Sequence, residues 1–398
     1  MSTEPVTDWT TDYDILDPEY VANPFPVWDD LRETCPIAHS LRWGGSWMPT
    51  RYADVFAVAH DVATFSSRDV GVLTFSEEDR PPGPINLPVP PIDSDPPQHT
   101  WTRRLLLPWF SHSQVAIYEP ITRELCSGLI DGFIETGRAD AAADYAQQIP
   151  VRVIAKILGV PGELADTFTG WVRDVLEFAH DEVRSKRGFD GIVEFLLRQL
   201  AERRDDPSDD LISALLQTEV EGEPIPDEII MGMAALTLIA GVDTTWSAIG
   251  SSMWHLATHP ADARRLIDDP DIMSQAVEEL LRAYSPVTMA RVANHDVELQ
   301  GCPVKAGEKV LLNFPAANRD PAVFPQPDVV DFDRAENRHV AFGAGIHRCA
   351  GSNLARMELR VAIEEWLRRI PEFRLADDAE VTWAGGQVRG PRTVPVVF

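Results

Sequence analysis

The chain has 398 residues, of which 44% are hydrophobic and 25% charged, and its formal net charge is −28. This length and composition predict a soluble globular protein with a large core. The acidic balance argues against nucleic acid as a partner, because phosphate binding depends on lysine and arginine.

The four cysteines lie far apart and show no zinc-ligand spacing, so the sequence predicts neither a disulfide framework nor a zinc site. The N-terminal stretch is polar and acidic, without the apolar run of a signal peptide or a membrane anchor. We therefore expect a cytoplasmic protein with reduced thiols.

The N-terminal part of the chain mixes short helices with a hairpin. Residues 23–34 are predicted to start a short helix, and residues 51–67 are predicted to form a second helix. Between them, a Gly-Gly turn with apolar flanks predicts a hairpin at 37–52. A proline-rich loop follows over 67–97. Loops of this length in a compact domain are usually functional or disordered.

The middle of the chain, residues 98–257, has helical patterns almost throughout, and β-type patterns return at 296–314 and 380–398. No linker or internal repeat divides the chain. The predicted fold class is mainly α with small β-sheets, in one domain over 1–398, and not an alternating doubly wound fold.

The segment 227–260 is apolar nearly all round, which predicts a helix buried through the centre of a domain. Its unbroken apolar run ends at Asp243 and is too short for a membrane span. Small residues at 240 and 241 predict a gap beside the helix, where the Thr244 hydroxyl can bond back to a carbonyl and loosen the turn. Taken alone, this segment fits a kinked core helix with a satisfied acid.

A cysteine-containing turn, HVAFGAGIHRCAG, occupies residues 339–351 and precedes a predicted amphipathic helix at 352–369. Cys349 therefore lies at a helix N-terminus, where free backbone N–H groups favour an anion. The surrounding glycines permit close approach by something flat or bulky. This pattern indicates a thiolate that acts as a metal ligand or as a nucleophile.

Taken together, these segments resemble the cytochrome P450 superfamily of haem-thiolate monooxygenases, most closely the soluble bacterial class that includes the camphor hydroxylase. The resemblance covers nearly the whole chain. The cysteine-loop signature of the family is matched in full by Phe342, Gly343, Gly345, His347, Cys349 and Gly351. Weaker motifs in the expected order are matched by Ala240, Gly241, Asp243, Thr244, Glu279, Arg282, His99 and Arg103.

The resemblance implies a haem b cofactor with Cys349 as the proximal ligand of the iron, and a thiolate ligand favours O–O cleavage. Phe342 should pack close to the sulfur. Asp243 and Thr244 would relay protons to dioxygen. Charged donors that would hold the two haem propionates are implied at four positions, His99, Arg103, Arg291 and His339.

One departure from the family pattern concerns Glu279 and Arg282, whose side chains can meet at a spacing of three on a helix. In the family an arginine before the cysteine loop often completes this pair. The expected position here is Val329, so we expect an incomplete triad whose other partner the sequence does not identify.

A substrate pocket is implied by matching position, and its residues are mostly apolar. We therefore expect a neutral hydrophobic substrate such as a terpenoid or an aromatic molecule, although Arg68 or Arg173 could anchor a carboxylate. The implied lining residues are Val72, Leu73, Phe75, Val175, Phe178, Leu236, Thr237, Val287, Thr288, Met289, Ala290 and Val388.

The resemblance also implies partners: a ferredoxin and an NAD(P)H-dependent ferredoxin reductase, because no flavin-binding or ferredoxin-like segment is seen in the chain. A basic island at Arg338, Arg348, Arg356 and Arg360, set against Glu358, is expected to dock an acidic ferredoxin. We expect a monomer that binds no membrane.

Three alternatives remain open at this stage. The first is a peroxide-using peroxygenase, against which the Asp243–Thr244 pair argues because such an enzyme needs no proton relay. The second is a haem-based gas sensor or carrier, which would not turn over NADH. The third, without the resemblance, is a cysteine nucleophile paired with His347, although such a histidine is usually distant in sequence.

Overall fold

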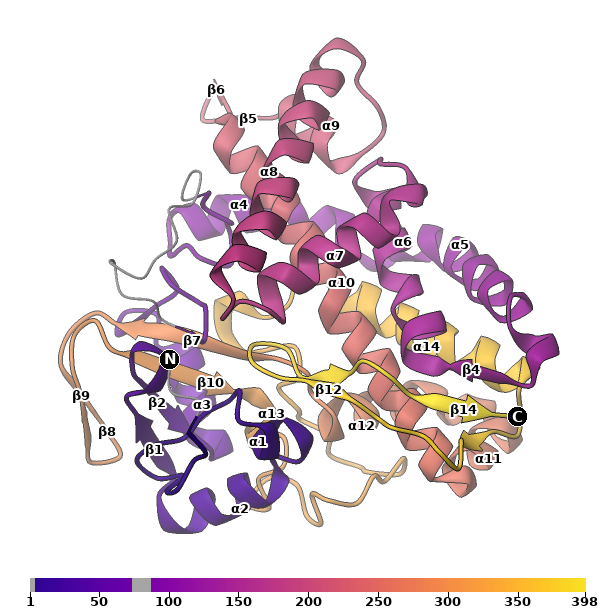
Figure 1. The fold of residues 1–398 in the computed structure, drawn as a ribbon. Helices are drawn as coiled ribbons and strands as arrows, with labels where there is room; N and C mark the ends of the chain where they lie inside the picture. Colours follow the sequence, from indigo (N-terminus) through magenta and orange to yellow (C-terminus); the bar gives the residue numbers. More distant parts are fainter. Residues whose placement is uncertain (1–3, 74–86) are drawn as a thin grey trace.

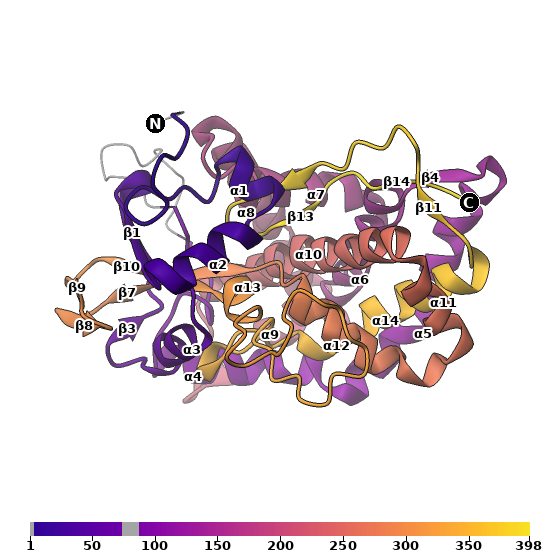
Figure 2. The ribbon, with the colours of Figure 1, turned by 90° about the horizontal axis from the view of Figure 1, so that it is seen from below.

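A computed structural model describes residues 4–73 and 87–398. One helix of 32 residues, α10 (Asp227–Thr258), crosses the molecule, and the other elements surround it (Figures 1 and 2). The expected fold class, mainly α with small sheets, is confirmed. The expected residue Phe75 lies outside the described residues.

The α-helices mostly follow the predicted helical patterns, but the helix expected over 51–67 ends at His60, and Phe65–Ser66 form a strand. Before α10 the helices are α1 (Pro18–Ala22), α2 (Phe25–Thr34), α3 (Tyr52–His60), α4 (Gln98–Leu106), α5 (His112–Asp131), α6 (Gln148–Ile157), α7 (Ala165–Leu176), α8 (Glu182–Asp205) and α9 (Leu211–Leu216). After it they are α11 (Pro260–Asp268), α12 (Met273–Ala283), α13 (Phe314–Ala317) and α14 (Ser352–Arg369).

The largest sheet lies beside one end of α10 and has the strand order β1-β2-β10-β7-β3 (Figure 1). Only the β10–β2 pair is parallel. The predicted first hairpin is confirmed, because β1 pairs antiparallel with β2. The strands are β1 (Ile37–Ser40), β2 (Ser46–Pro49), β3 (Phe65–Ser66), β7 (Thr288–Ala293) and β10 (Lys309–Asn313).

The remaining strands form smaller antiparallel sheets. The predicted C-terminal β segment forms β12, β13 and β14, and β14 joins β11 and β4 in a three-stranded sheet. These strands are β4 (Arg138–Asp140), β5 (Glu219–Val220), β6 (Glu223–Pro224), β8 (Val297–Leu299), β9 (Cys302–Val304), β11 (Arg374–Leu375), β12 (Trp383–Ala384), β13 (Gly390–Pro391) and β14 (Pro395–Val397).

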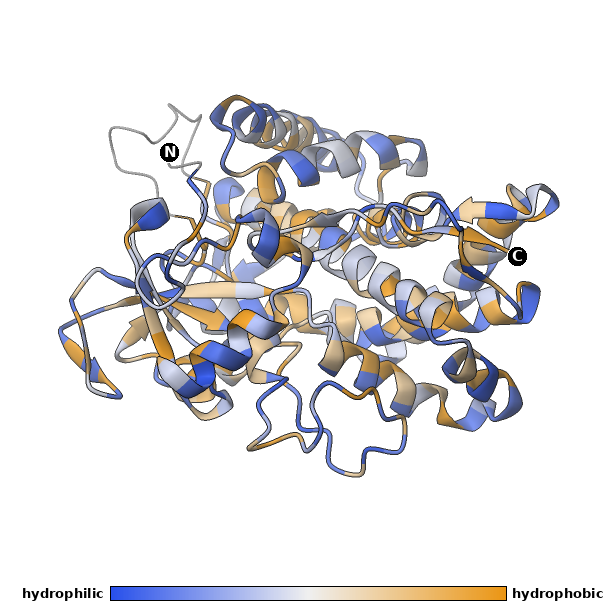
Figure 3. Cartoon of the chain, turned by 60° about the horizontal axis from the view of Figure 1, so that its bottom comes forward, coloured by the Kyte–Doolittle hydropathy of each residue, from blue (hydrophilic) through white to orange (hydrophobic). Residues whose placement is uncertain are grey.

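The main core forms around α10, which packs against α6, α7, α8 and α14. Helix α10 is long and apolar enough to cross a membrane, but 72% of its most apolar window is buried inside the protein. Apolar residues predominate along this helix and its neighbours, whereas the outer helices alternate in polarity (Figure 3). The helix is therefore the central element of a globular core, as its composition predicts.

Candidate functional site

The cysteine loop runs from the end of a long irregular segment into α14. A 3-10 turn at Gly345–His347 precedes Cys349, whose backbone N–H donates to the Phe342 carbonyl at 2.7 Å. Gly345 has a φ of +69°, and a Cβ there would lie 2.3 Å from the Ala59 carbonyl oxygen of α3. Only glycine allows this turn to approach α3 so closely.

Cys349 is an exposed residue of the loop, and protein atoms are packed densely near its thiol. Desolvation by these surroundings raises the pKa of the thiol. The backbone N–H of Gly351 and the charges of Arg103, Arg348 and Arg356 act in the opposite direction and favour the thiolate. This sulfur thus lies among groups that stabilise an anion, as a metal-ligating thiolate requires.

Three of the predicted cationic residues meet beside the loop. The rings of His99 and His347 lie 4.3 Å apart, and the charges of Arg103 and Arg291 reach both histidines. Desolvation, followed by these neighbouring positive charges, lowers the pKa of His347 to about 3. The Nε2 atom of His347 lies 2.8 Å from the Ser67 hydroxyl.

His339 is not part of this cluster, which corrects its expected role as a propionate partner. Its Nε2 lies 3.0 Å from a carboxylate oxygen of Glu278, and its Nδ1 accepts from the backbone N–H of Ala341 at 3.2 Å. Both ring nitrogens are therefore in use. His347, which the sequence places within the cysteine-loop signature, occupies the position beside His99 instead.

The chemistry of this cluster fits the propionates of a haem. Arg291 is 4% exposed, and desolvation lowers its pKa to about 10. Among the described residues, Arg291 makes one hydrogen bond, to the Ala290 carbonyl. The buried Nε2 atom of His99 has no hydrogen-bond partner among the described residues. Buried cationic donors with so few protein acceptors match a ligand that carries two carboxylates.

Asp243 on α10 is fully buried, and Nη2 of Arg392 lies 2.9 Å from its Oδ1. Arg392 also contacts Glu177 at 3.0 Å and the Ser247 hydroxyl at 3.1 Å. Burial raises the pKa of the Asp243 carboxyl, and Arg392 opposes that rise. The acid is thus held in an ion-pair network that joins α10, the end of α7 and the C-terminal strands; the sequence offered no signal for Arg392.

The small residues of α10 have different surroundings from those expected. A Cβ at Gly241 would lie 2.4 Å from Cδ1 of Ile154, so this glycine admits α6 and does not open a gap. Ala240 is exposed and Thr244 half-buried, four residues apart on one face. The Thr244 hydroxyl donates to the Ala240 carbonyl at 2.7 Å, as predicted, and the helix is continuous.

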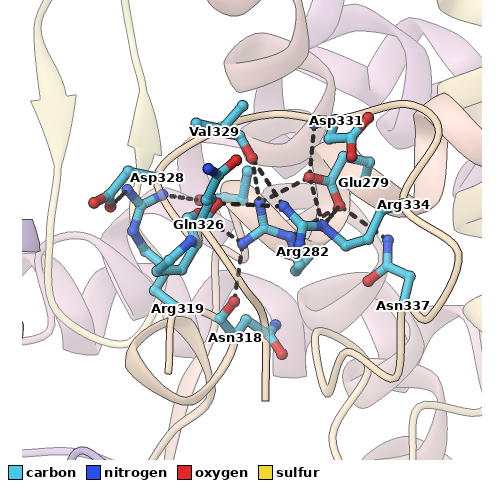
Figure 4. Close-up of polar contacts among 12 residues, drawn as sticks. Glu279, Arg282, Asn318, Arg319, Gln326, Asp328, Val329, Asp331, Arg334 and Asn337 are labelled. Atoms are coloured by element: carbon cyan, nitrogen blue, oxygen red, sulfur yellow. Dashed lines mark hydrogen bonds and ion pairs between the residues drawn. The ribbon is translucent and has the colours of Figure 1, made fainter. Parts of the chain in front are cut away.

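The Glu279–Arg282 pair is buried, with one hydrogen bond at 2.8 Å and another at 2.9 Å between the side chains. The expected incomplete triad is wrong, because Arg334 donates from Nε to both oxygens of Glu279, at 3.0 and 3.1 Å (Figure 4). Val329, the position expected for the third member, contributes its carbonyl oxygen to both arginines. The irregular loop carries Arg334 back to the pair, which no periodic pattern could indicate.

The predicted pocket residues fall into two groups. Val287 and Val388 form an isolated β-bridge and therefore lie side by side, and their role as pocket walls stays a prediction. Ala290 and Val72 instead belong to the core below the N-terminal sheet, where Ala290 is fully buried. The remaining described positions are buried or half-buried, namely Leu73, Val175, Phe178, Leu236, Thr237, Thr288 and Met289.

The two arginines that could anchor an acidic substrate both have protein partners. Arg68 donates to the Asn294 side chain at 2.5 Å, and Arg173 binds both oxygens of Glu177, at 2.8 and 2.9 Å. The Glu177 carboxylate offsets the charge of Arg173, whereas the neutral Asn294 amide occupies a donor of Arg68 and leaves its charge in place.

The expected basic island is largely neutralised. Arg338 pairs with Glu336, Arg356 with Glu278, and Arg360 with Glu119 and Glu364. Glu358 is buried, at 1% exposed, and does not face this surface. Arg348 in the loop and Arg104 on α4 are exposed, and the described residues show no ion pair for either.

A helix-rich fold around one long helix, with a lone cysteine in a glycine turn beside buried cationic donors, defines the class of haem-thiolate proteins. The family model described as cytochrome P450 matches residues 151–380, and the chain belongs to this family. Its members are haem b monooxygenases, so the chain is an oxidoreductase of this type.

Comparison with individual proteins agrees with this assignment. The chain is 35% identical to mycinamicin IV hydroxylase/epoxidase of Micromonospora griseorubida, over 93% of this chain and 94% of that protein. It is 37% identical to the vitamin D(3) 25-hydroxylase of Pseudonocardia autotrophica, over 98% of each chain. A myxobacterial cytochrome P450 solved with myristic acid has a TM-score of 0.87 and 34% identity, over 96% of this chain and 98% of that one.

Proposed function

We propose that this cytochrome P450 hydroxylates a neutral, hydrophobic small molecule, with electrons from a separate ferredoxin and its NAD(P)H-dependent reductase. When bound, haem b supplies the oxygen chemistry: one atom of dioxygen enters the substrate and the other leaves as water. The observation that supports a neutral substrate is the internal pairing of Arg68 and Arg173. One structural neighbour was solved with myristic acid, which carries a carboxylate, and one relative is named for mycinamicin IV, so related proteins differ in the ligands they take.

Residues in and beside the cysteine loop would bind the haem. Cys349 would ligate the iron through its thiolate, and Arg103, Arg291, His99 and His347 would bind the propionates. The Gly351 N–H supports the thiolate form of the sulfur. Each of these side chains has the donor or acceptor that its role requires.

Two residues of α10 would transfer protons. The Thr244 hydroxyl would donate to dioxygen once it leaves the Ala240 carbonyl, and it can accept from a water molecule. Asp243 would supply protons from the far side, although it must first leave the ion pair with Arg392. Positioned proton transfer is typically worth on the order of 10²–10⁴ in rate.

The electron partner is proposed to dock near the exposed Arg348 and Arg104, in a protein that otherwise carries a charge of −28. Two isolated positive charges steer an acidic ferredoxin less strongly than the expected four would. We further propose a cytoplasmic monomer, in which residues 1–398 form one haem domain.

The cysteine assignment is tested with Cys349→Ala, with Cys126→Ala and Cys302→Ala as controls. The wild type and both controls are expected to show the red-shifted ferrous–CO Soret band of a thiolate ligand, and Cys349→Ala is expected to lose it. Retention of the band in Cys349→Ala would show that another residue binds the iron.

The substrate class is tested by titrating haem-loaded protein with matched pairs of neutral and carboxylate ligands on the same carbon skeleton, while the haem spin state is followed. Ligands that shift the spin state then enter an assay of NADH consumption and hydroxylated product, with a ferredoxin and its reductase. A preference for the carboxylate member of most pairs contradicts the proposed neutral substrate.

A further inference from the structure

Two side chains contact the ring of Phe342, one from α14 and one from the loop that carries Phe342 itself. The guanidinium of Arg356, on α14, lies 4.4 Å from the centroid of the Phe342 ring. The ring of His339 lies 6.1 Å from the same centroid, at an interplanar angle of 47°. The Phe342 carbonyl in turn accepts the Cys349 N–H at 2.7 Å, so whatever fixes Phe342 also acts on the cysteine turn.

Glu278, on α12, joins the two groups that contact the ring. It accepts from Nε of Arg356 at 2.5 Å and from Nη2 at 2.8 Å, and it lies 3.0 Å from Nε2 of His339. Although burial acts in the opposite direction, these partners lower the pKa of Glu278 to about 2. The carboxylate is therefore ionised at neutral pH and holds Arg356 in a bidentate geometry.

Arg356 is thus oriented toward the interior. Its side chain is 30% exposed, and its guanidinium is committed to Glu278 and to the face of Phe342. An exposed arginine in a docking surface would keep its donors in water. A fixed cation over an aromatic face contributes attraction and keeps the ring in one orientation.

We propose that Arg356, fixed by Glu278 and His339, is a positioning residue that holds Phe342 against the cysteine turn and raises the reduction potential of the haem through its positive charge. Glu278 offsets part of the charge of Arg356, and the positive charge that remains stabilises the reduced haem, which carries one more electron, relative to the oxidised form. This inference rests on the proposed ligation of the iron by Cys349, because only then does the turn lie beside the iron.

The test compares midpoint potentials of haem-loaded variants by spectroelectrochemistry. Arg356→Gln should lower the ratio of reduced to oxidised haem at a fixed applied potential by about three- to tenfold, the size of a partly screened charge interaction. Arg356→Lys keeps the charge and should recover most of that loss. Recovery by lysine separates an effect of charge from general damage to the loop.

Arg360→Gln is the matched control. Arg360 lies one turn further along α14 and is paired with Glu119 and Glu364, and the described residues show no contact between it and Phe342. Its removal should leave the potential unchanged. A wild-type potential in Arg356→Gln, or an equal shift in Arg360→Gln, overturns the proposal.

The ferrous–CO spectrum of every variant separates this inference from the ligand assignment. An unchanged thiolate band with an unchanged potential in Arg356→Gln refutes the role of Arg356 alone. A thiolate band that persists in Cys349→Ala refutes the ligand assignment, whatever Arg356 does. If Arg356→Gln fails to load haem, the milder Arg356→Lys and Arg356→Met decide, since lysine should keep the potential and methionine should lower it.

Discussion

At the scale of single residues, Asp243 and Thr244 lie one position apart on α10 but have opposite environments. Asp243 is enclosed and paired with Arg392, whereas Thr244 is half-buried on the same face as the exposed Ala240. A carboxylate held by an arginine gives up that pairing only at a cost. Proton delivery through Asp243 therefore depends on how readily its network opens.

Asp243→Asn is expected to slow turnover by on the order of 10²-fold or more at unchanged substrate affinity, because the amide cannot carry a proton to the site. The solvent isotope effect on turnover should rise. Glu228→Gln, at the exposed start of the same helix, is the control and should behave as wild type. An unaltered isotope effect in Asp243→Asn would mean that protons enter by another route.

Thr244→Ala is expected to keep consuming NADH and dioxygen but to release hydrogen peroxide in place of hydroxylated product, because the hydroxyl that holds the proton-donating water is lost. Product formed per NADH is the quantity to measure. Thr258→Ala removes a similar hydroxyl-to-carbonyl bond at the end of α10 and serves as control. Full coupling in Thr244→Ala would reduce Thr244 to a helix-stabilising residue.

At the scale of elements, the long loop before the cysteine turn is held to α12 by charge. Arg334 binds Glu279 through Nε and the carbonyl oxygens of Pro325 and Val329 through its terminal nitrogens. The Asn337 side chain donates to the same carboxylate at 3.1 Å. A loop without helix or strand thus gains a defined path next to the site (Figure 4).

Arg334→Ala or Arg282→Ala is expected to cost up to about 3–5 kcal/mol of stability, because each removes one of the two arginines that bind the buried carboxylate of Glu279. Chemical unfolding of haem-loaded protein measures this cost, and haem content should fall with it. Val329→Ala changes an exposed side chain whose carbonyl remains, so it should unfold like wild type. Wild-type unfolding of Arg334→Ala would show that Arg282 alone satisfies Glu279.

At the scale of the whole molecule, one buried acid links stability to pH. Glu358 on α14 is 1% exposed, and its Oε1 has no hydrogen-bond partner among the described residues. Desolvation raises the pKa of this carboxyl to about 8 in the folded protein. The folded state therefore keeps a proton that the unfolded state releases near the ordinary glutamate pKa of 4.5.

The contribution of Glu358 to stability is greatest below about pH 4.5 and declines until the pH passes about 8. Within this window each pH unit costs the wild type up to about 1.4 kcal/mol relative to a non-titrating side chain. The free energy of unfolding of Glu358→Gln should therefore increase relative to that of the wild type as the pH rises from 5 to 8. Parallel pH curves for the two proteins would contradict the raised pKa.

The sequence alone determined the features that short-range patterns encode. The glycines and the cysteine of the loop, the apolar α10 and the first hairpin each occupy one continuous segment, so residue type and spacing were sufficient to predict them. The sequence also indicated the Asp243–Thr244 pair of α10 and the Glu279–Arg282 pair, because the members of each pair lie within one helical turn.

Only the tertiary structure decided how distant segments meet. Three contacts join segments whose approach depends on irregular loops. They are the contacts of Arg334 with Glu279, of Arg392 with Asp243, and of His347 with His99. Gly241 admits Ile154 of another helix, a contact that no local pattern reports. A charged side chain binds whichever partner the folded chain brings within about 3 Å, and that choice is absent from local periodicity.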